Sequence, residues 1–358
     1  MQNLLWRSCS KQPWLQCASY LSLLVFFAHQ PARADTYDEL WNECHYISQC
    51  SCSPANASVH LNSDKAVYGI LNDWRIGNGQ ADFVQPGEAS IGAIGLLYGY
   101  QRLLQAGRST PALDSVAKTA LSAFFWSWVR NSANRTGNGF PAAIAYNAAG
   151  NVISKGGGDA RVTAEILIAM RKYCLLSPNG DRASYQSQEY AFAHSLADFA
   201  NANLSSWTVD RSYAVAAFHG FANWAAAVGD NATSTYYHAR AGTISGWITA
   251  AQDHGNWRNY FAYLNGGGSG VYNGGIDQTG FAPYEFNARP AGEQFAKDLS
   301  DWWDHGQAYN NVWLTVQTGT YAGGVHQWTP QTGTSNQVYP GSSLQLADVC
   351  WKIAQATG

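Results

Sequence analysis

The stretch from 86 to 106 reads PGEASIGAIGLLYGYQRLLQA, and its pattern returns in several later parts of the chain. Apolar residues recur at intervals of three and four, which predicts an amphipathic helix that begins near Glu88 and ends before Gly107. Gly92, Gly95 and Gly99 lie on or near one face, where they would let a neighbouring helix approach closely. A packed helix of this kind favours a mainly α-helical protein.

Four loops of this chain end in one carboxylate immediately before an Ala- or Leu-rich helical run. The four carboxylates belong to Glu88, Asp159, Asp210 and Asp277. Helices that start at one common rim would gather these acids around a single opening. Acidic residues are also favoured at helix starts because they accept from free N–H groups and complement the helix dipole. The set predicts a carboxylate-lined cleft, with capping as the alternative for each member.

Similar periodicity predicts helices over residues 35–49, 64–73, 111–132, 159–175, 184–203, 210–228, 232–253, 277–287, 291–305 and 342–355. Alternating patterns predict small β-hairpins over residues 140–153 and 257–272. Short turns and longer Gly- and aromatic-rich loops alternate between the helices, which is typical of an (α/α) toroid of five or six helical hairpins. No composition shift divides the chain, so we expect residues 35–358 to form one catalytic domain.

The N-terminal residues have the pattern of a secretory signal peptide. Arg7 and Lys11 precede an apolar run over residues 20–27, and Ala32-Arg33-Ala34 supplies a small-x-small cleavage site. The apolar run is too short to span a bilayer. We therefore expect residues 1–34 to be removed and the mature protein to be secreted.

The composition limits the classes of partner. Residues 1–34 hold three of the 21 cations and no acid, so 18 cations face 24 acids in the mature chain, a net charge of −6. A mildly acidic surface argues against nucleic acid and against anionic membranes. Aromatic residues (14%) slightly outnumber charged ones (13%), which suits stacking on sugar rings. We expect an oligo- or polysaccharide substrate, a monomer, and no cofactor or metal, since no histidine pair has ligand spacing.

Five cysteines remain after the signal peptide, and an exported protein would use them in at most two disulfides. Pairing of Cys44 or Cys52 with Cys350 would join the two ends of the chain, as closure of a ring requires. Four sequons favour a glycoprotein; they begin at Asn56, Asn134, Asn203 and Asn231.

Glycoside hydrolysis needs one protonated carboxylic acid and one ionised carboxylate. Glu88 is the candidate general acid, because we expect Phe83, Tyr98 and Tyr100 to surround it and apolar burial raises a carboxylic pKa. Asp159 follows three glycines that would let a substrate approach, and it is a candidate base or sugar-orienting residue. Asp210 and Asp277 compete for the remaining catalytic role.

Other side chains are candidates for substrate binding through charge, hydroxyl groups or aromatic stacking. They are Arg161, Arg211, Tyr213, Trp257, Tyr284 and Trp303. His219 lies in the middle of an apolar helical run, which favours a core histidine over a catalytic one.

Two short stretches resemble the family-eight glycoside hydrolases. Residues 86–97 are similar to the acid-bearing second helix of that family, and Gly158-Asp159-Ala160-Arg161 is similar to its Asp-rich helix start. The resemblance implies an (α/α)6 barrel, an inverting mechanism, Glu88 as the acid and Asp159 as a sugar-binding residue. Asp210-Arg211 is the nearest counterpart of the family's catalytic base.

Two other enzyme classes fit the same pattern. A polysaccharide lyase on the same toroid would abstract a proton beside a uronate carboxylate, using His219 with Asn223 or Arg211 with Tyr213. A pocket cyclase acting on a small apolar metabolite would need a dry aromatic cavity. A third alternative, a lectin-like binder, would tolerate Glu88→Gln.

Overall fold

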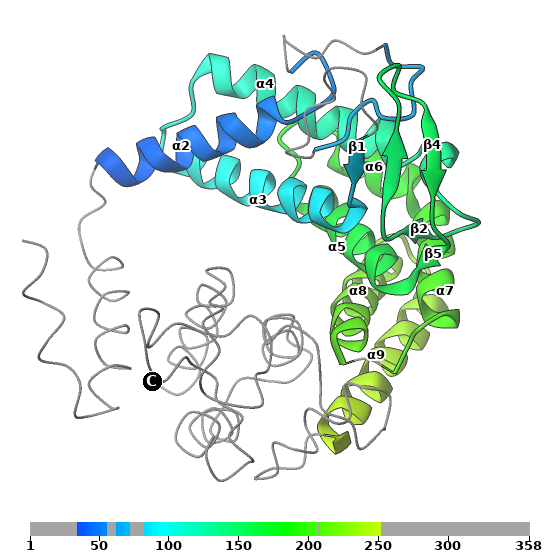
Figure 1. Ribbon diagram of the computed structural model, residues 1–358. Helices are drawn as coiled ribbons and strands as arrows, with labels where there is room; N and C mark the ends of the chain where they lie inside the picture. The colour runs from blue at the N-terminus through cyan, green and yellow to red at the C-terminus, as the bar shows by residue number, and fades with distance from the viewer. Residues whose placement is uncertain (1–33, 56–61, 72–81, 207, 252–358) are drawn as a thin grey trace, which may run out of the picture. The chain divides into compact units, whose positions relative to one another are not determined.

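The computed structural model describes residues 34–55, 62–71, 82–206 and 208–251, and these residues are mainly helical with a few short strands (Figure 1). The chain divides into two compact units. One comprises Ala34–Ser205 and Tyr213–Gly246, and it holds almost all of the described residues. The other comprises Met1–Arg33, Ser206–Ser212 and Trp247–Gly358. The expected signal peptide and the expected helices after residue 252 lie outside the described residues.

The first three described helices form a tightly packed group. They are α2 (Ala34–Gln49), α3 (Pro86–Gln105) and α4 (Pro111–Ala123). A methyl group on Gly99 of α3 would lie 2.6 Å from Sγ of Cys44 and 3.3 Å from Cδ1 of Leu40, so only glycine lets α2 come this close. The predicted close approach is confirmed at Gly99, whereas Gly95 has no atom within 4 Å of a Cβ and is exposed.

The start of α4 is capped by the two residues Thr110 and Pro111. The hydroxyl of Thr110 accepts from the backbone N–H of Leu113 at 3.3 Å, and Pro111 fills the first helical position. The helix continues into a π-helical turn, η1 (Phe124–Trp128), and a 3-10 turn follows, η2 (Ser132–Asn134).

The helix predicted over residues 64–73 is wrong. Residues 62–71 form turns, and Gly69 adopts φ +92°, a left-handed conformation that interrupts an α-helix. A side chain on Gly69 would also lie 2.1 Å from the carbonyl oxygen of Ala123. The tight packing of this turn against the end of α4 therefore outweighs the helical periodicity.

The hairpin predicted over residues 140–153 is confirmed and is part of a slightly larger β region. Strands β1 (Asp82–Val84), β3 (Ile144–Tyr146) and β4 (Val152–Lys155) form an antiparallel sheet in the order β1-β3-β4. Two further short strands, β2 (Phe140–Pro141) and β5 (Gly158–Asp159), pair with each other. This second pairing fixes the backbone just before the next helix.

The remaining helices are α5 (Ala160–Leu176), α6 (Arg182–Gln188), α7 (Tyr190–Ala202), α8 (Thr208–Ala227) and α9 (Asn231–Ala251). The single helix predicted over residues 184–203 is therefore two helices, which join at the buried Glu189. None of the described helices is long and apolar enough to cross a membrane.

Helices that are not consecutive in the sequence pack side by side in the same direction. Early α3 meets early α5 where Gly87 touches the Glu165 side chain, and late α3 meets late α5 where Lys172 lies 5.2 Å from the ring of Tyr98. The pair α7 and α9 runs parallel in the same way. Tyr190 at the start of α7 donates to Asp230 just before α9 (2.8 Å), and Tyr237, about two turns into α9, donates to Asp198, about two turns into α7 (2.6 Å).

Buried aromatic rings and one buried asparagine organise the core beneath η1. Trp128 donates through Nε1 to the hydroxyl of Tyr146 at 3.1 Å, and that hydroxyl donates to Oδ1 of Asn134 at 2.8 Å. The amide of Asn134 donates in turn to the carbonyl oxygens of Ala66 and Trp128. Because Asn134 is fully buried, the sequon that begins there has no room for a glycan in the folded chain.

Candidate functional site

Asp159 is the N-cap of α5, so the capping alternative holds for this residue. Its Oδ1 accepts from the backbone N–H of Val162 at 3.0 Å, and its carbonyl oxygen accepts from the hydroxyl of Thr163 at 2.6 Å. Pairing of β5 with β2 places Phe140 opposite Asp159 and holds the carboxylate in this position. One carboxylate oxygen is thus committed to the helix, and the side chain remains only half-buried.

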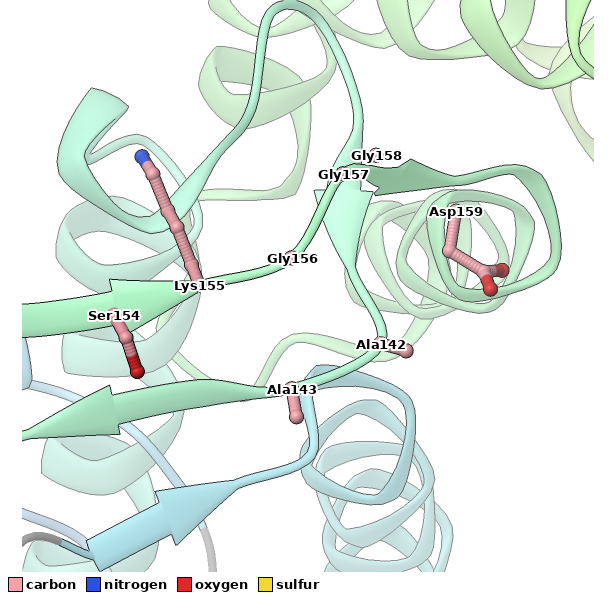
Figure 2. Close-up of a pocket in the computed structure, with 8 residues that line it drawn as sticks. All are labelled: Ala142, Ala143, Ser154, Lys155, Gly156, Gly157, Gly158 and Asp159. Carbon is pink, nitrogen blue, oxygen red and sulfur yellow. The ribbon is translucent and has the colours of Figure 1, made fainter.

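A pocket of about 420 Å³ lies beside Asp159, between the β1-β3-β4 sheet and the β2-β5 pair (Figure 2). It is lined by Ala142, Ala143, Ser154, Lys155, Gly156, Gly157, Gly158 and Asp159. Figure 2 shows the Lys155 amine and the Asp159 carboxylate pointing away from each other. Lys155 instead donates through Nζ to the carbonyl oxygens of Ala133 (2.7 Å) and Arg135, so it braces the neighbouring loop.

The three glycines before Asp159 have different structural roles. A methyl group on Gly156 or Gly157 would meet no atom within 4 Å, so both positions open onto free space. A methyl group on Gly158 would lie 2.4 Å from the ring of Phe199 in α7. Gly158 is therefore needed for packing, whereas Gly156 and Gly157 leave the pocket wall accessible.

Glu88 lies in the first turn of α3 and is exposed, so the described part of the chain does not supply the apolar surroundings expected for it. Tyr98 is 48% exposed on the same side of the helix, and Tyr100 is buried, with its hydroxyl bonded to Asp114. The helical period explains the outcome, because Glu88, Ile91 and Tyr98 share the outer face of α3 while Ala89, Ala93 and Leu96 form the buried face.

A buried carboxylate that the sequence interpretation did not select lies beside the start of α3. Glu165 is 7% exposed, and its Oε1 is 3.7 Å from Nε of Arg161 one turn earlier on α5. A methyl group on Gly87 would lie 1.9 Å from Oε2 of Glu165, so this carboxylate touches the residue that precedes Glu88. An acidic residue inside the apolar run Ala164-Glu165-Ile166-Leu167 was the available signal.

The other sequence-predicted residues fall in the second compact unit, on α8, or outside the described residues. Asp210 and Arg211 belong to the second unit, where the Arg211 guanidinium lies 5.0 Å from the ring of Trp247. Tyr213 is half-buried on α8. Asp277, Trp257, Tyr284, Trp303 and Cys350 lie outside the described residues.

His219 is not a core residue as the sequence suggested. It is exposed on α8, and its ring contacts the ring of His238 on α9. Burial of part of the ring, followed by the proximity of His238, lowers the pKa of His219 below its ordinary value. Among the described cysteines, no disulfide joins any two, and no group of three or more metal-binding side chains occurs in the same part of the chain.

Comparison with known proteins gives no family assignment. No protein-family model matches the chain, and no curated protein matches it significantly.

Proposed function

We propose that this chain is a secreted carbohydrate-active enzyme, a glycoside hydrolase built on an (α/α) toroid of five or six helical hairpins. In this proposal Glu88 is the general acid and Asp159 orients a sugar or a water molecule. The observation that carries it is the parallel packing of α3 and α5, with the start of α3 against the side chain of Glu165. Two carboxylate-bearing helix starts therefore belong to adjacent helices that point the same way.

The helix directions support the toroid. In such a fold, inner helices lie parallel to one another, and each is connected through an antiparallel outer helix. The pairs α3/α5 and α7/α9 are parallel, as this arrangement requires. Helix α7 runs opposite to α5, because Phe199 near the end of α7 touches Gly158 just before α5, while Tyr185, before α7, contacts Tyr173 late in α5.

The two carboxylates lie in different surroundings. Glu88 is exposed and has no hydrogen bond or ion pair to the described residues, so its carboxyl group is available to a glycosidic oxygen. Asp159 is fixed in orientation by its bond to Val162, which leaves its second oxygen for a sugar hydroxyl or a water. A positioned acid contributes roughly 10²–10⁴-fold to rate.

The pocket supplies a surface that a sugar can approach. A methyl group at Gly156 or Gly157 would meet no atom within 4 Å, so both glycines leave free space next to Asp159. Arg161 and Glu165 hold each other at 3.7 Å on the adjoining turn of α5 and add polar groups beside the start of α3. Sugar sites commonly combine such polar groups with aromatic walls. Trp257, Tyr284 and Trp303 remain the sequence-based candidates for stacking, and they lie outside the described residues.

The proposal is tested by incubating the mature protein, residues 35–358, with a panel of polysaccharides. New reducing ends without ultraviolet absorbance indicate hydrolysis, whereas absorbance from a new C=C bond indicates a lyase. Glu88→Gln should lower the hydrolytic rate by about 10³-fold with an unchanged melting temperature, because the side chain is exposed. The matched control is Glu43→Gln, an exposed acid on α2, which should keep full activity.

Three outcomes would overturn the assignment. If the protein hydrolyses no polysaccharide in the panel, the proposal that it is a glycoside hydrolase is wrong. If Glu88→Gln keeps full activity, Glu88 is not the general acid. Sugar binding that persists in Glu88→Gln without any bond cleavage by the wild type would favour a lectin-like protein.

A further inference from the structure

We propose that Glu165 is a positioning residue of the proposed active site, which holds the first turn of α3, and with it Glu88, against the start of α5. This inference rests on the proposed hydrolase function and gives a role to a side chain that the proposed catalytic pair does not include. Glu165 belongs to α5 and is 7% exposed, so substrate does not need to touch it for the role assigned here.

One oxygen of the Glu165 carboxylate lies against the backbone of α3. A methyl group built on Gly87 would be 1.9 Å from Oε2 and 3.1 Å from Cδ of Glu165, so any side chain at position 87 would displace the carboxylate. Gly87 is buried and directly precedes Glu88. A shift of the Glu165 carboxylate is therefore passed to the backbone that carries Glu88.

The start of α3 has a use for a negative charge from another helix. Its N-cap residue, Gln85, makes no side-chain capping bond, and Pro86 occupies the first helical position. The first N–H groups of a helix have no partner within the helix and carry partial positive charge. The carboxylate of Glu165, which α5 places beside Gly87, therefore stabilises this end of α3.

The other oxygen of the carboxylate faces a cation on the same helix. Oε1 of Glu165 is 3.7 Å from Nε of Arg161, whose side chain is 30% exposed. Arg161 stands two positions after Asp159 in the sequence. One carboxylate is thus held from two sides, by the turn that follows Asp159 and by the glycine that precedes Glu88, and it fixes these two helix starts relative to each other.

An acid is an unusual choice at this position of α5. Ala164, Ile166 and Leu167 beside it are fully buried, and an apolar side chain would fill the same space without taking a charge out of water. A buried ion pair is often no more stabilising than well-packed apolar residues of similar volume, but it can fix one arrangement of the elements that it joins. Position 165 therefore suits a residue that sets geometry.

Glu165→Gln tests the inference, because it keeps the size of the side chain and removes its charge. The assay uses the mature protein and the polysaccharide of the panel that the wild type degrades fastest. We expect kcat to fall by about 10- to 100-fold while KM changes little, because the substitution disturbs the placement of Glu88 and not the affinity for substrate.

The matched control is Glu189→Gln, which changes a second buried acid that is paired with an arginine. Oε1 of Glu189 is 3.3 Å from Nη1 of Arg130, and the residue is 1% exposed. The backbone of Glu189 is bonded to Tyr185, whose ring contacts Tyr173 late in α5, so this acid lies toward the end of α5 that is opposite to Asp159. Its substitution should leave kcat unchanged.

A size swap at the contact tests the same inference without removing the carboxylate. Gly87→Ala places a methyl group on the Glu165 oxygen, and Glu165→Asp withdraws the carboxylate by one methylene, so each alone should lower kcat by about tenfold. The double variant makes room for the methyl group and should have a higher kcat than either single variant. A double variant whose kcat is lower than both would overturn the inference.

The outcomes separate this inference from the proposed function. If the wild type degrades a polysaccharide and Glu165→Gln keeps its kcat, changes KM alone, or loses no more kcat than Glu189→Gln, then Glu165 does not position Glu88, although the hydrolase assignment stands. If the wild type degrades nothing in the panel, the hydrolase assignment is wrong and this inference falls with it.

Discussion

The starts of α3 and α5 differ in what their carboxylates do, although the sequence presents them alike. Asp159 caps α5 and accepts from the N–H of Val162, whereas Glu88 is exposed in the first turn of α3 and Gln85, the residue at the cap, makes no side-chain capping bond. Helix α3 begins with Pro86, which has no N–H to satisfy and already holds a helical φ. A helix start that needs no capping side chain leaves its acidic residue available for other chemistry.

The neighbourhoods of the two helix starts differ as well. A hairpin strand, β5, leads into α5 and fixes Asp159, while the start of α3 lies against Glu165, a carboxylate that comes from α5 itself. Two acids at one helix start, one exposed and one buried, resemble the arrangement by which enzymes separate the roles of two carboxyl groups.

The largest expected effect comes from substitutions of Asp159, which distinguish a role in capping α5 from a role in catalysis. Asp159→Asn keeps an oxygen that accepts from Val162, so the free energy of unfolding should change by less than about 0.5 kcal/mol, whereas Asp159→Ala should lose about 1 kcal/mol. If Asp159 also binds substrate through its charge, both variants should lose hydrolysis by about 10²-fold or more. Urea unfolding and the reducing-end assay measure the two effects separately. If Asp159→Ala loses activity and Asp159→Asn keeps it, Asp159 serves only as the N-cap of α5.

The next effect concerns the glycines before α5. Gly158→Ala should destabilise the protein by about 1–3 kcal/mol, because the new methyl group would overlap the Phe199 ring. Gly157→Ala is the matched control one residue away, and it should leave the unfolding free energy nearly unchanged. If the pocket binds sugar, Gly157→Ala should also raise KM for the polysaccharide, because the new methyl group would occupy part of the pocket. An unchanged KM would contradict a role of this pocket in substrate binding.

The smallest expected effect concerns Asp114, an acidic residue in the first turn of α4, a third helix start beside those of α3 and α5. Hydrogen bonds from Ser109 and then from Tyr100 lower the pKa of Asp114 below its ordinary value of 3.8. The folded state therefore gains stability from Asp114 above the unfolded pKa, and this gain is lost as the pH falls through the folded value. Melting curves should show a steeper loss for the wild type than for Asp114→Asn below about pH 4. A difference between the two proteins that is independent of pH would contradict this role.

Local sequence patterns predicted most of the described helices because their signals are local. Thr110-Pro111 marks the start of α4, and the three-and-four spacing of apolar residues gives the extent of α3 and α5 to within a few residues. The helix over residues 64–73 failed for a tertiary reason, since the backbone of Ala123 approaches Gly69 and requires a left-handed conformation.

The site was less predictable than the fold, because burial depends on which face of a helix meets a neighbour. The sequence placed Glu88 at a helix start correctly but placed it in apolar surroundings, and α3 turned out to bury its other face. Glu165 was missed although an acid inside an apolar run is a signal of burial, because the run alone does not say which helix covers it. The His219–His238 pair was missed because the two residues lie on different helices.

The sequence alone determined where α4 and α5 begin to within a residue, that Thr110 caps α4, and where the β-hairpin lies. These features depend on backbone geometry and on hydrogen bonds between residues a few positions apart. Only the tertiary structure decided that α3 and α5 run side by side, that Gly87 meets Glu165, and that two histidines face each other. Those contacts join residues whose separation in the chain ranges from 19 to 78 positions, and only the packing of whole helices fixes them.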